Sequence, residues 1–331
     1  MKKTRFALIG AGGIAQSYAQ AFRDHPDAEL VAVIDVRPEA AQKVAATVPG
    51  CQAFATLDTA CGMAEFDATI IATPPVTHEK LVVKLLERGQ HVLCEKPFTV
   101  GAESAFRMAA AARKADRVLT MASKFRYVSD VNKARAFIDD GLIGEVVLFE
   151  NAFTSRVDMT HRWNGDPAIS GGGVLIDNGA HSLDLTRFFL GTLSDVHAVE
   201  GRRFQPLPVE DTAQVFVRSA AGVMGTIDLS WSINKERESY IDVHGLLGTI
   251  RVGWKESKYK LTNKEWVVFG KGYDKVQAFR DNVGNFARHL RDGEKLVITV
   301  DDAVANVAAI DAAYRSLNQA DWTQLTEATT V

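Results

Sequence analysis

An acid and a histidine one helical turn apart are the residues of this chain best suited to move a proton. Asp177 and His181 lie in a segment, 174–190, that is predicted to be helical, so their side chains share one face with Asp184. Histidine titrates near neutral pH and can accept a hydroxyl proton, while a carboxylate beside it would orient the ring and stabilise its cation. The glycines at 171–173 would let a ligand approach the backbone. A purely structural Asp–His pair in a buried helix is the alternative.

A lysine follows a predicted strand at the end where ligands bind in open α/β sheets. The segment Glu95-Lys96-Pro97 comes directly after the apolar run His91–Cys94. Lys96 could bond a substrate hydroxyl there and stabilise the charge of a developing alkoxide. A Glu-Lys pair is ordinarily a solvated surface feature. Its place at the end of this strand is what favours a role in substrate binding.

A glycine-rich turn near the N-terminus indicates a dinucleotide site. The residues Gly10-Ala11-Gly12-Gly13-Ile14-Ala15 read G-x-G-x-x-A between a predicted strand and a predicted helix. The first glycine permits a tight turn, the second lets the backbone approach a pyrophosphate, and the small sixth residue lets helix and strand pack closely. The unpaired N–H groups of the helix N-terminus would then attract the phosphates.

An acid after the second predicted strand suits the adenosine end of such a cofactor. Asp35 follows the run Leu30–Ile34, about 20 residues beyond the glycine turn, where a carboxylate accepts hydrogen bonds from ribose hydroxyls. The same carboxylate would repel a 2′-phosphate, so NAD is predicted over NADP, and Arg37 would soften that rejection enough to allow NADP. A glycine turn of some other α/β domain, with Asp35 capping a helix, is the alternative.

Polar residues at other strand ends and in one loop are further candidates. Ala72-Thr73-Pro74 and His78 follow another buried strand and are expected to line the cofactor site, although the prolines could simply end the strand and His78 could cap the next helix. Two more groups could contact a hydroxylated substrate or could serve only surface and packing roles. They are Lys124, Arg126 and Tyr127 after the last strand of the first half, and Asp158, His161, Arg162, Trp163 and Asn164 in a polar loop.

The elements expected to position these residues fall into two halves. Up to residue 122, apolar runs without alternation are interleaved with helical patterns, which predicts a Rossmann-type, doubly wound parallel sheet. Beyond it, strand-like runs joined by short turns predict an α+β domain with an antiparallel sheet. Two helices close the chain, and in the first of them Phe279, Val283, Phe286 and Leu290 share one face. We therefore expect a dinucleotide-binding domain over 1–122 and a substrate domain over 123–331.

The composition narrows the possible partners. The chain has 331 residues, a formal net charge of -3 and no block of like charges, so neither nucleic acid nor an anionic membrane surface is expected to bind. Cys51, Cys61 and Cys94 have no metal-ligand spacing, which indicates reduced thiols and no metal site. There is no apolar run of about 20 residues, and the glycines at 10–13 interrupt the signal-like start, so we expect a cytoplasmic protein.

In this order, the motifs resemble the Gfo/Idh/MocA family, named for glucose–fructose oxidoreductase, inositol dehydrogenase and a rhizopine-catabolism protein. The likeness covers most of the chain, from the glycine turn through the triple glycine to a late G-x-x-G turn at Gly245–Gly248. It implies a Rossmann domain followed by a domain with a large, mostly antiparallel open sheet. The exposed face of that sheet often pairs in this family, so a homodimer or homotetramer is expected.

The resemblance also implies roles for single residues. Lys96 would bind the substrate, His181 would be the general acid/base with Asp177 as its partner, Glu95 would contact the nicotinamide ribose, and the Lys96–Pro97 peptide bond would be cis. The expected activity is hydride transfer between NAD(P) and a secondary alcohol of a sugar, a sugar derivative or an inositol. A keto-sugar or nucleotide-sugar reductase of the same family, or a non-catalytic NAD-binding regulator, is the alternative. The identity of the substrate and the direction of the reaction do not follow from the sequence.

Overall fold

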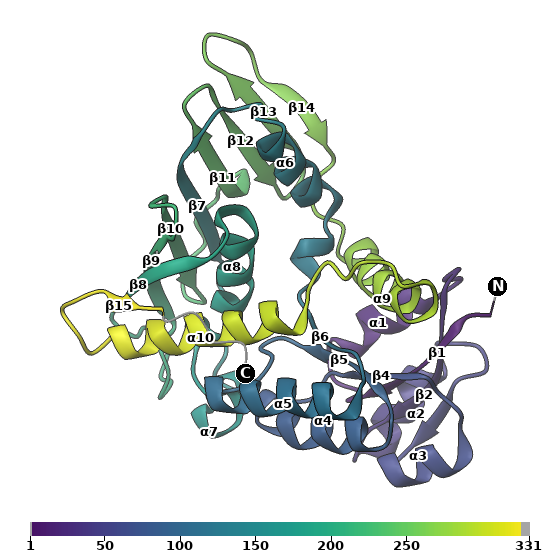
Figure 1. Cartoon of the computed structure of the whole chain (residues 1–331). Helices are drawn as coiled ribbons and strands as arrows, with labels where there is room; N and C mark the ends of the chain where they lie inside the picture. Colours follow the sequence, from purple (N-terminus) through teal and green to yellow (C-terminus); the bar gives the residue numbers. More distant parts are fainter. Residues whose placement is uncertain (1, 326–331) are drawn as a thin grey trace. The chain divides into compact units, whose positions relative to one another are not determined.

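Six strands in the first part of the chain form a parallel sheet in the computed structural model, which describes residues 2–325 (Figure 1). The strand order is β3-β2-β1-β4-β5-β6, and each neighbouring pair is parallel, which confirms the doubly wound sheet. The sequence did not indicate the short strand β3. The strands are β1 (Thr4–Ile9), β2 (Ala28–Ile34), β3 (Gln52–Phe54), β4 (Ala68–Ile71), β5 (His91–Glu95) and β6 (Leu119–Ala122).

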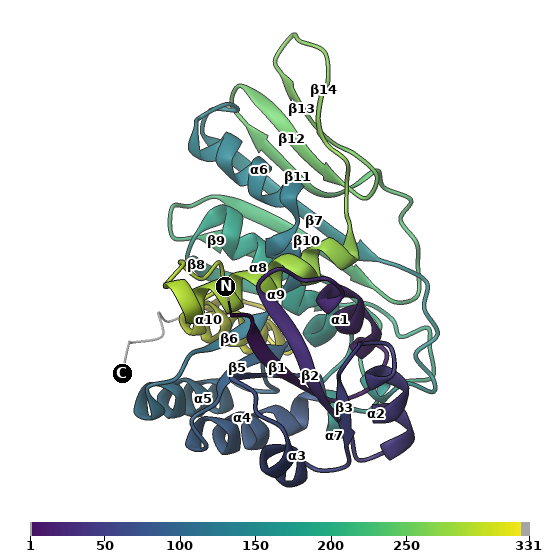
Figure 2. The same ribbon diagram turned by 90° about the vertical axis from the view of Figure 1, so that its right-hand side faces the viewer.

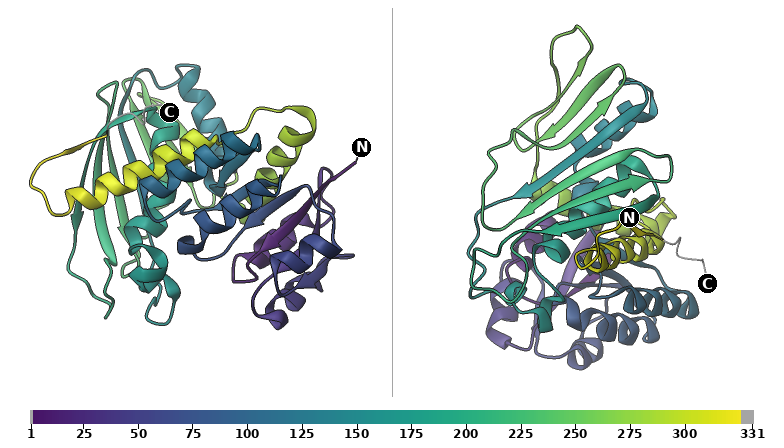
Figure 3. Two further views of the ribbon diagram at one scale, coloured as in Figure 1. Left: turned by 60° about the horizontal axis from the view of Figure 1, so that its bottom comes forward. Right: turned by 90° about the vertical axis from the view of Figure 1, so that its left-hand side faces the viewer.

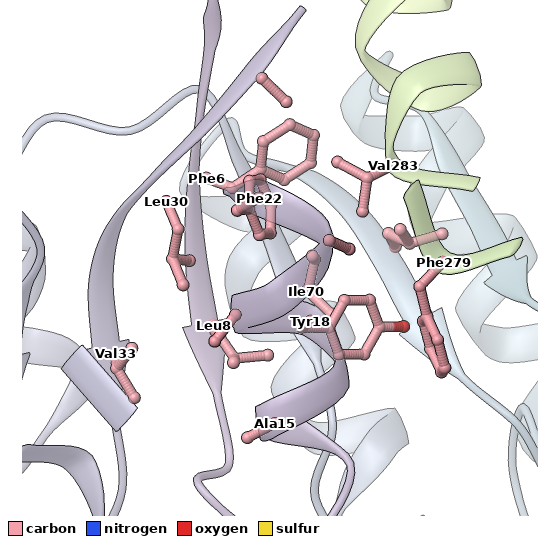
Figure 4. Packing of buried hydrophobic residues seen from close by; sticks show 14 of the residues in the cluster. Phe6, Leu8, Ala15, Tyr18, Phe22, Leu30, Val33, Ile70, Phe279 and Val283 are labelled. Atoms are coloured by element: carbon pink, nitrogen blue, oxygen red, sulfur yellow. The ribbon is translucent and has the colours of Figure 1, made fainter. Parts of the chain in front are cut away.

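Helices cover both faces of this sheet (Figure 2). One face carries α1 (Ala15–Phe22), α2 (Pro38–Ala45) and the late helix α9 (Lys275–Asp292), and the other carries α4 (His78–Glu87) and α5 (Ala102–Ala115). The shorter elements of this region are α3 (Leu57–Met63), η1 (Pro75–Thr77) and η2 (Lys124–Tyr127). The buried core between β1, α1 and α9 is visible in Figure 4, where Phe6, Phe22 and Val283 interlock. The rings of Phe6 and Phe22 lie 5.3 Å apart, so α1 is fixed directly against the first strand.

A late segment of the chain packs against the core of the parallel sheet. By its contacts, the first compact unit comprises the chain up to Thr99, Glu103–Tyr127 and Asp274–Val304. The predicted apolar face of the late helix explains this packing, because Phe279, Val283 and Phe286 of α9 are buried in the core of this unit. The first unit therefore extends beyond the predicted boundary at residue 122, because the segment Asp274–Val304 also belongs to it.

Nine strands form the sheet of the second unit, which comprises Val100–Ala102, Val128–Tyr273 and the chain from Ala305 on (Figure 3). The order is β14-β13-β12-β11-β7-β10-β9-β8-β15, and only the pairing of β7 with β10 is parallel among the described strands, which confirms a mostly antiparallel sheet. The strands are β7 (Val146–Thr154), β8 (Leu193–Glu200), β9 (Thr212–Ser219), β10 (Met224–Ser230), β11 (Ser239–Gly245), β12 (Gly248–Gly253), β13 (Ser257–Leu261), β14 (Val267–Gly270) and β15 (Thr323–Gln324). The sequence did not indicate β7 or β13.

One face of this sheet is covered by helices. The predicted helix α8 (Val174–Leu190) packs there against β7 and β10, with the rings of Phe149 and Phe189 5.6 Å apart. Because side chains alternate along β7, Glu150 lies on the opposite face, where it pairs with His244 of β11 at 2.9 Å. The remaining helices are α6 (Ser129–Asp139), η3 (Trp163–Gly165), α7 (Pro167–Ser170) and α10 (Val300–Ser316). Within residues 2–325, none of the helices has the length and apolar character needed to span a membrane.

Candidate active site

The glycine turn before α1 leaves open space above the helix N-terminus. Gly10 has a φ of +100°, and a Cβ there would lie 2.5 Å from the carbonyl oxygen of Ala72, so this position admits only glycine. By contrast, apart from chain neighbours, no heavy atom among the described residues comes within 4 Å of a Cβ built on Gly12 or Gly13. Ala15 is fully buried, as expected for the small sixth residue of the motif. The turn therefore offers the exposed backbone that a pyrophosphate requires.

Asp35 lies beside this turn at the end of β2, as the motif predicts. Its carboxylate accepts hydrogen bonds from the backbone N–H groups of Ala11, at 2.7 Å, and Arg37, at 2.9 Å. The Arg37 guanidinium also bonds it, with Nε 3.2 Å from Oδ1. Burial opposes ionisation, but these bonds outweigh it and lower the pKa of Asp35. A fixed negative charge therefore stands next to the glycine turn, partly balanced by Arg37.

His78 lies deeper than its predicted place in the cofactor site. Its ring is fully buried, with Nε2 2.8 Å from the carbonyl oxygen of Thr73 and Nδ1 3.1 Å from that of Pro97. Burial outweighs these carbonyls and lowers the pKa of the imidazole, and a neutral ring has a single N–H to donate. One ring nitrogen therefore donates to a backbone carbonyl, and the ring is packed between the loop after β4 and the loop after β5.

Glu95 ends β5, and Lys96 follows it, beside a tyrosine that the sequence did not single out. The Tyr18 hydroxyl on α1 donates to Glu95 Oε1 at 2.7 Å, and the backbone N–H of Lys96 donates to Oε2 at 3.0 Å. Burial raises the pKa of Glu95, although the hydrogen bond from Tyr18 and the charges of Lys124 and Lys96 act against it. The Lys96–Pro97 peptide bond is cis, which confirms that expectation. Glu95, Lys96 and Lys124 thus form one charged group in the first unit.

The predicted proton-transfer pair lies in the second unit. Asp177 and His181 both belong to α8, Asp177 in its first turn. His181 is 6 % exposed, and its ring lies 6.2 Å from that of Phe153 on β7 in an edge-on arrangement. The space above the N-terminus of this helix is filled by the side chains of Glu210 and Tyr314, so the triple glycine admits protein atoms where we expected a ligand. Lys96 belongs to the first unit, and its convergence with this pair stays a prediction.

The weaker substrate candidates have diverse surroundings. Arg126 is buried and forms an ion pair with Asp302 at 3.5 Å, and the Tyr127 hydroxyl donates to Asn285 at 3.2 Å. These two residues thus have structural partners within the first unit, whereas Lys124 lies in the charged group around Glu95. In the loop before α7, Trp163 is 42 % exposed. His161 and Arg162 are also exposed, Asn164 is half-buried, and Asp158 accepts a hydrogen bond from the backbone of Thr160.

In the range 2–325 there is no group of three or more His, Cys, Asp or Glu side chains that could hold a metal ion.

Comparison with known proteins supports this assignment of the fold and motifs. Residues 4–123 match the oxidoreductase family with an NAD-binding Rossmann fold, and residues 131–251 match the GFO/IDH/MocA C-terminal domain. The chain is 28 % identical to the inositol 2-dehydrogenase of Rhizobium meliloti (strain 1021), with 95 % of this chain and 96 % of that protein aligned. It is 26 % identical to the D-glucoside 3-dehydrogenase of Escherichia coli (strain K12), with 94 % of this chain and 91 % of that protein aligned.

A solved structure shows the same fold over nearly the whole chain. Levoglucosan dehydrogenase in complex with NADH and levoglucosan superposes with a TM-score of 0.90 at 20 % identity, covering 98 % of this chain and 100 % of that one. The two family matches cover the regions that contain the predicted motifs. These motifs are the glycine turn with Asp35, the segment Glu95-Lys96-Pro97 and the Asp177–His181 pair. The chain therefore belongs to the Gfo/Idh/MocA family of oxidoreductases.

Proposed function

We propose that this protein is an NAD-dependent dehydrogenase that transfers a hydride between the nicotinamide and a secondary alcohol of a sugar, a sugar derivative or an inositol. The observation that carries the proposal is the Asp177–His181 pair on a largely buried helix, in a chain whose other unit has an open glycine turn beside Asp35. The relatives named above as inositol 2-dehydrogenase and D-glucoside 3-dehydrogenase support the substrate class.

Each polar residue has a distinct part in the proposed reaction. His181 takes the hydroxyl proton of the alcohol and returns it in the reverse direction, and Asp177 orients the imidazole and stabilises its charged form. Lys96 donates to the reacting oxygen and stabilises the alkoxide as it forms. When bound, the nicotinamide accepts or returns the hydride. Glu95, held by Tyr18 at 2.7 Å, contacts the nicotinamide ribose.

The preference for NAD over NADP follows from the charge next to the glycine turn. Asp35 carries a lowered pKa and is therefore ionised at neutral pH, so it accepts hydrogen bonds from ribose hydroxyls and repels a 2′-phosphate. Arg37 bonds the same carboxylate and weakens the repulsion. We expect NADP to bind more weakly than NAD without being excluded. The remaining cofactor contacts are assigned to Gly10, Gly12, Gly13, Ile14, Ala72, Thr73 and Pro74, with His78 supporting the two loops.

We further propose that the protein forms a homodimer or homotetramer through the helix-free face of the nine-stranded sheet. Strand register places Val199, Met224 and Val268 on the face that carries Glu150. All three are large apolar side chains about half exposed, at 48 %, 57 % and 57 %. They lie on β8, β10 and β14, separated by polar and charged residues, and a second copy of the chain seated on this face would shield them from water. Sedimentation equilibrium tests this, and a monomer at micromolar concentration would contradict it.

A cytoplasmic location is proposed on the state of the thiols. Cys51, Cys61 and Cys94 are all unpaired. Free thiols are typical of proteins in a reducing compartment. Fractionation of the cells that make the protein would test the proposal, and recovery from an oxidising compartment would contradict it.

The main proposal is tested by measuring NAD and NADP reduction with a panel of inositols, aldoses, glycosides and nucleotide sugars. We expect turnover with at least one polyol or sugar, and loss of kcat by about 100-fold or more in Lys96→Ala and His181→Ala, because each removes a group that acts on the reacting oxygen. Lys114→Ala is the control variant, since this exposed lysine of α5 has no assigned part. Undiminished turnover in both alanine variants would refute the roles. NAD binding without turnover across the panel would favour the regulator.

A further inference from the structure

A buried glutamate binds the first turn of the helix that carries Asp177 and His181. Glu210 is 4 % exposed and lies just before β9. Its carboxylate accepts hydrogen bonds from the backbone N–H of Gly173, at 3.0 and 3.1 Å, and from that of Leu175, at 3.0 Å. Its own carbonyl oxygen accepts from the N–H of Val174 at 2.9 Å. One residue thus satisfies three consecutive N–H groups that a helix N-terminus leaves without intrahelical partners.

The three glycines at 171–173 leave the space that Glu210 occupies. A Cβ on Gly173 would lie 2.0 Å from the carbonyl oxygen of Glu210, and a Cβ on Gly172 would lie 2.0 Å from the hydroxyl oxygen of Tyr314. Both distances are far shorter than a van der Waals contact, so any larger residue would displace Glu210 or Tyr314. The glycines are therefore explained by contacts inside the second unit.

A second helix holds the glutamate in turn. The Tyr314 hydroxyl on α10 donates to Glu210 Oε1 at 2.7 Å, and Tyr314 is half-buried. Eight residues earlier on α10, the fully buried Asn306 donates through Nδ2 to the carbonyl oxygen of Ala180 at 2.9 Å. Ala180 is the residue directly before His181. The catalytic segment is thus held at its first turn by Glu210 and beside the histidine by Asn306.

We propose that Glu210 is a positioning residue, which with Tyr314 fixes the N-terminus of α8 and thereby the placement of Asp177 and His181. This inference rests on the proposed function. The carboxyl oxygens of Glu210 accept hydrogen bonds from N–H groups that would otherwise have no partner at this helix N-terminus. Because Asp177 lies in the same first turn, a small shift of that turn moves the carboxylate that orients the imidazole of His181. A misplacement of about 1 Å can lower a rate by about 100-fold.

The test compares Glu210→Ala, Glu210→Gln and Tyr314→Phe with a matched control, Asp211→Asn. Asp211 is equally buried and also accepts two backbone N–H groups, those of Phe204 and Gln205, but these belong to a loop. We expect kcat, with the panel substrate that turns over fastest, to fall by about 30-fold or more in Glu210→Ala. The two milder variants should lose about three- to ten-fold, because glutamine keeps an oxygen for the N–H groups and phenylalanine removes one donor. Asp211→Asn should stay within about two-fold.

Three further measurements separate positioning from general damage. The Kd for NAD should not change in any of these variants, since Glu210 belongs to the second unit, and the effect should fall on kcat more than on KM. Amide hydrogen exchange at Gly173, Val174 and Leu175 should accelerate in Glu210→Ala and, less, in Tyr314→Phe. If Glu210→Ala does not fold, the two milder variants carry the test. Equal behaviour of Glu210→Gln, Tyr314→Phe and Asp211→Asn, with His181→Ala inactive, would overturn this inference alone. Full activity of His181→Ala would overturn the proposed function.

Discussion

Two glycine-rich turns of this protein lead into helices, and they differ in what occupies the space at the helix N-terminus. The turn at 10–13 precedes α1 and is open at Gly12 and Gly13. The turn at 171–173 precedes α8 and is filled by Glu210 and Tyr314. In sequence both are short runs of glycine before a helix, and both suggested a backbone that a ligand could approach.

The comparison shows one physical device used in two ways. A helix N-terminus presents unpaired N–H groups and positive partial charge, so it attracts an anion. At α8 that anion is the carboxylate of Glu210, which is part of the protein. At α1 the nearby carboxylate of Asp35 accepts only the N–H of Ala11 from the glycine turn and leaves the remaining space open, as an external pyrophosphate requires. The filled turn at 171–173 holds α8 in place, whereas the open turn at 10–13 leaves room for a ligand.

Adding a methyl group to the filled turn should have the largest effect on stability. In Gly173→Ala the new Cβ would lie 2.0 Å from a backbone oxygen of Glu210, which cannot move without moving the strand that follows. We expect a loss of about 3 kcal/mol or more in the free energy of unfolding, through overpacking and loss of the bonds to Glu210. Urea denaturation monitored by circular dichroism measures it. A loss below about 1 kcal/mol would mean that the turn has free space after all.

The same change in the open turn should separate stability from binding. In Gly12→Ala the methyl group meets no described atom beyond its neighbours, so we expect the free energy of unfolding to change by less than about 0.5 kcal/mol. The Kd for NAD should rise by about ten-fold or more, because the methyl group occupies the space of the approaching pyrophosphate. Isothermal titration calorimetry gives the Kd, with Gly62→Ala as the control, because Gly62 of the same unit also has open space around its added Cβ and no positive φ. An unchanged Kd would contradict binding of the pyrophosphate at this turn.

The two carboxylates should also differ in how they link stability to pH, which is the smallest of these effects. The pKa of Asp35 is lowered because its hydrogen bonds outweigh burial. Its contribution to the free energy of unfolding is therefore present above the ordinary carboxyl pKa and is lost as pH falls through the lowered value. The pKa of Glu210 is raised by burial. Its contribution to the free energy of unfolding is therefore complete at low pH and declines as pH rises from the ordinary carboxyl pKa through the raised pKa. The stability of Asp35→Asn relative to wild type should therefore improve towards acid pH, and that of Glu210→Gln should improve towards neutral pH. Urea midpoints between pH 3 and 8 provide the measurement, and parallel pH profiles of the two variants would contradict the assignment.

Several elements could be predicted because their signal is local. The turn at 10–13, Asp35 and the apolar face of α9 depend on spacing within one or two neighbouring elements, and all three lie where the pattern places them. Strand β7 was missed because Glu150 and Asn151 interrupt its apolar run. Glu150 faces away from the helices, while Asn151 donates to the carbonyl oxygen of Tyr240 on the neighbouring strand β11, so a central strand tolerates both.

The polar partners inside the core lay beyond prediction for a different reason. Tyr18 and Glu95 are separated by 77 positions, and Glu210 and Tyr314 by 104, yet each pair shares a hydrogen bond of 2.7 Å. No periodicity links such residues. His78 likewise joins two loops through its ring, a role that its place at a helix start does not suggest.

Residue order alone predicted the parallel and antiparallel sheets and the family, because these follow from short-range periodicity and motif spacing. It also proposed which side chains bind a dinucleotide or move a proton. The tertiary structure decided which glycine turn is open and which is closed, and which buried groups hold the reactive ones in place. The reason is that a buried polar group must find a partner in space, and chain folding brings that partner from a distant position.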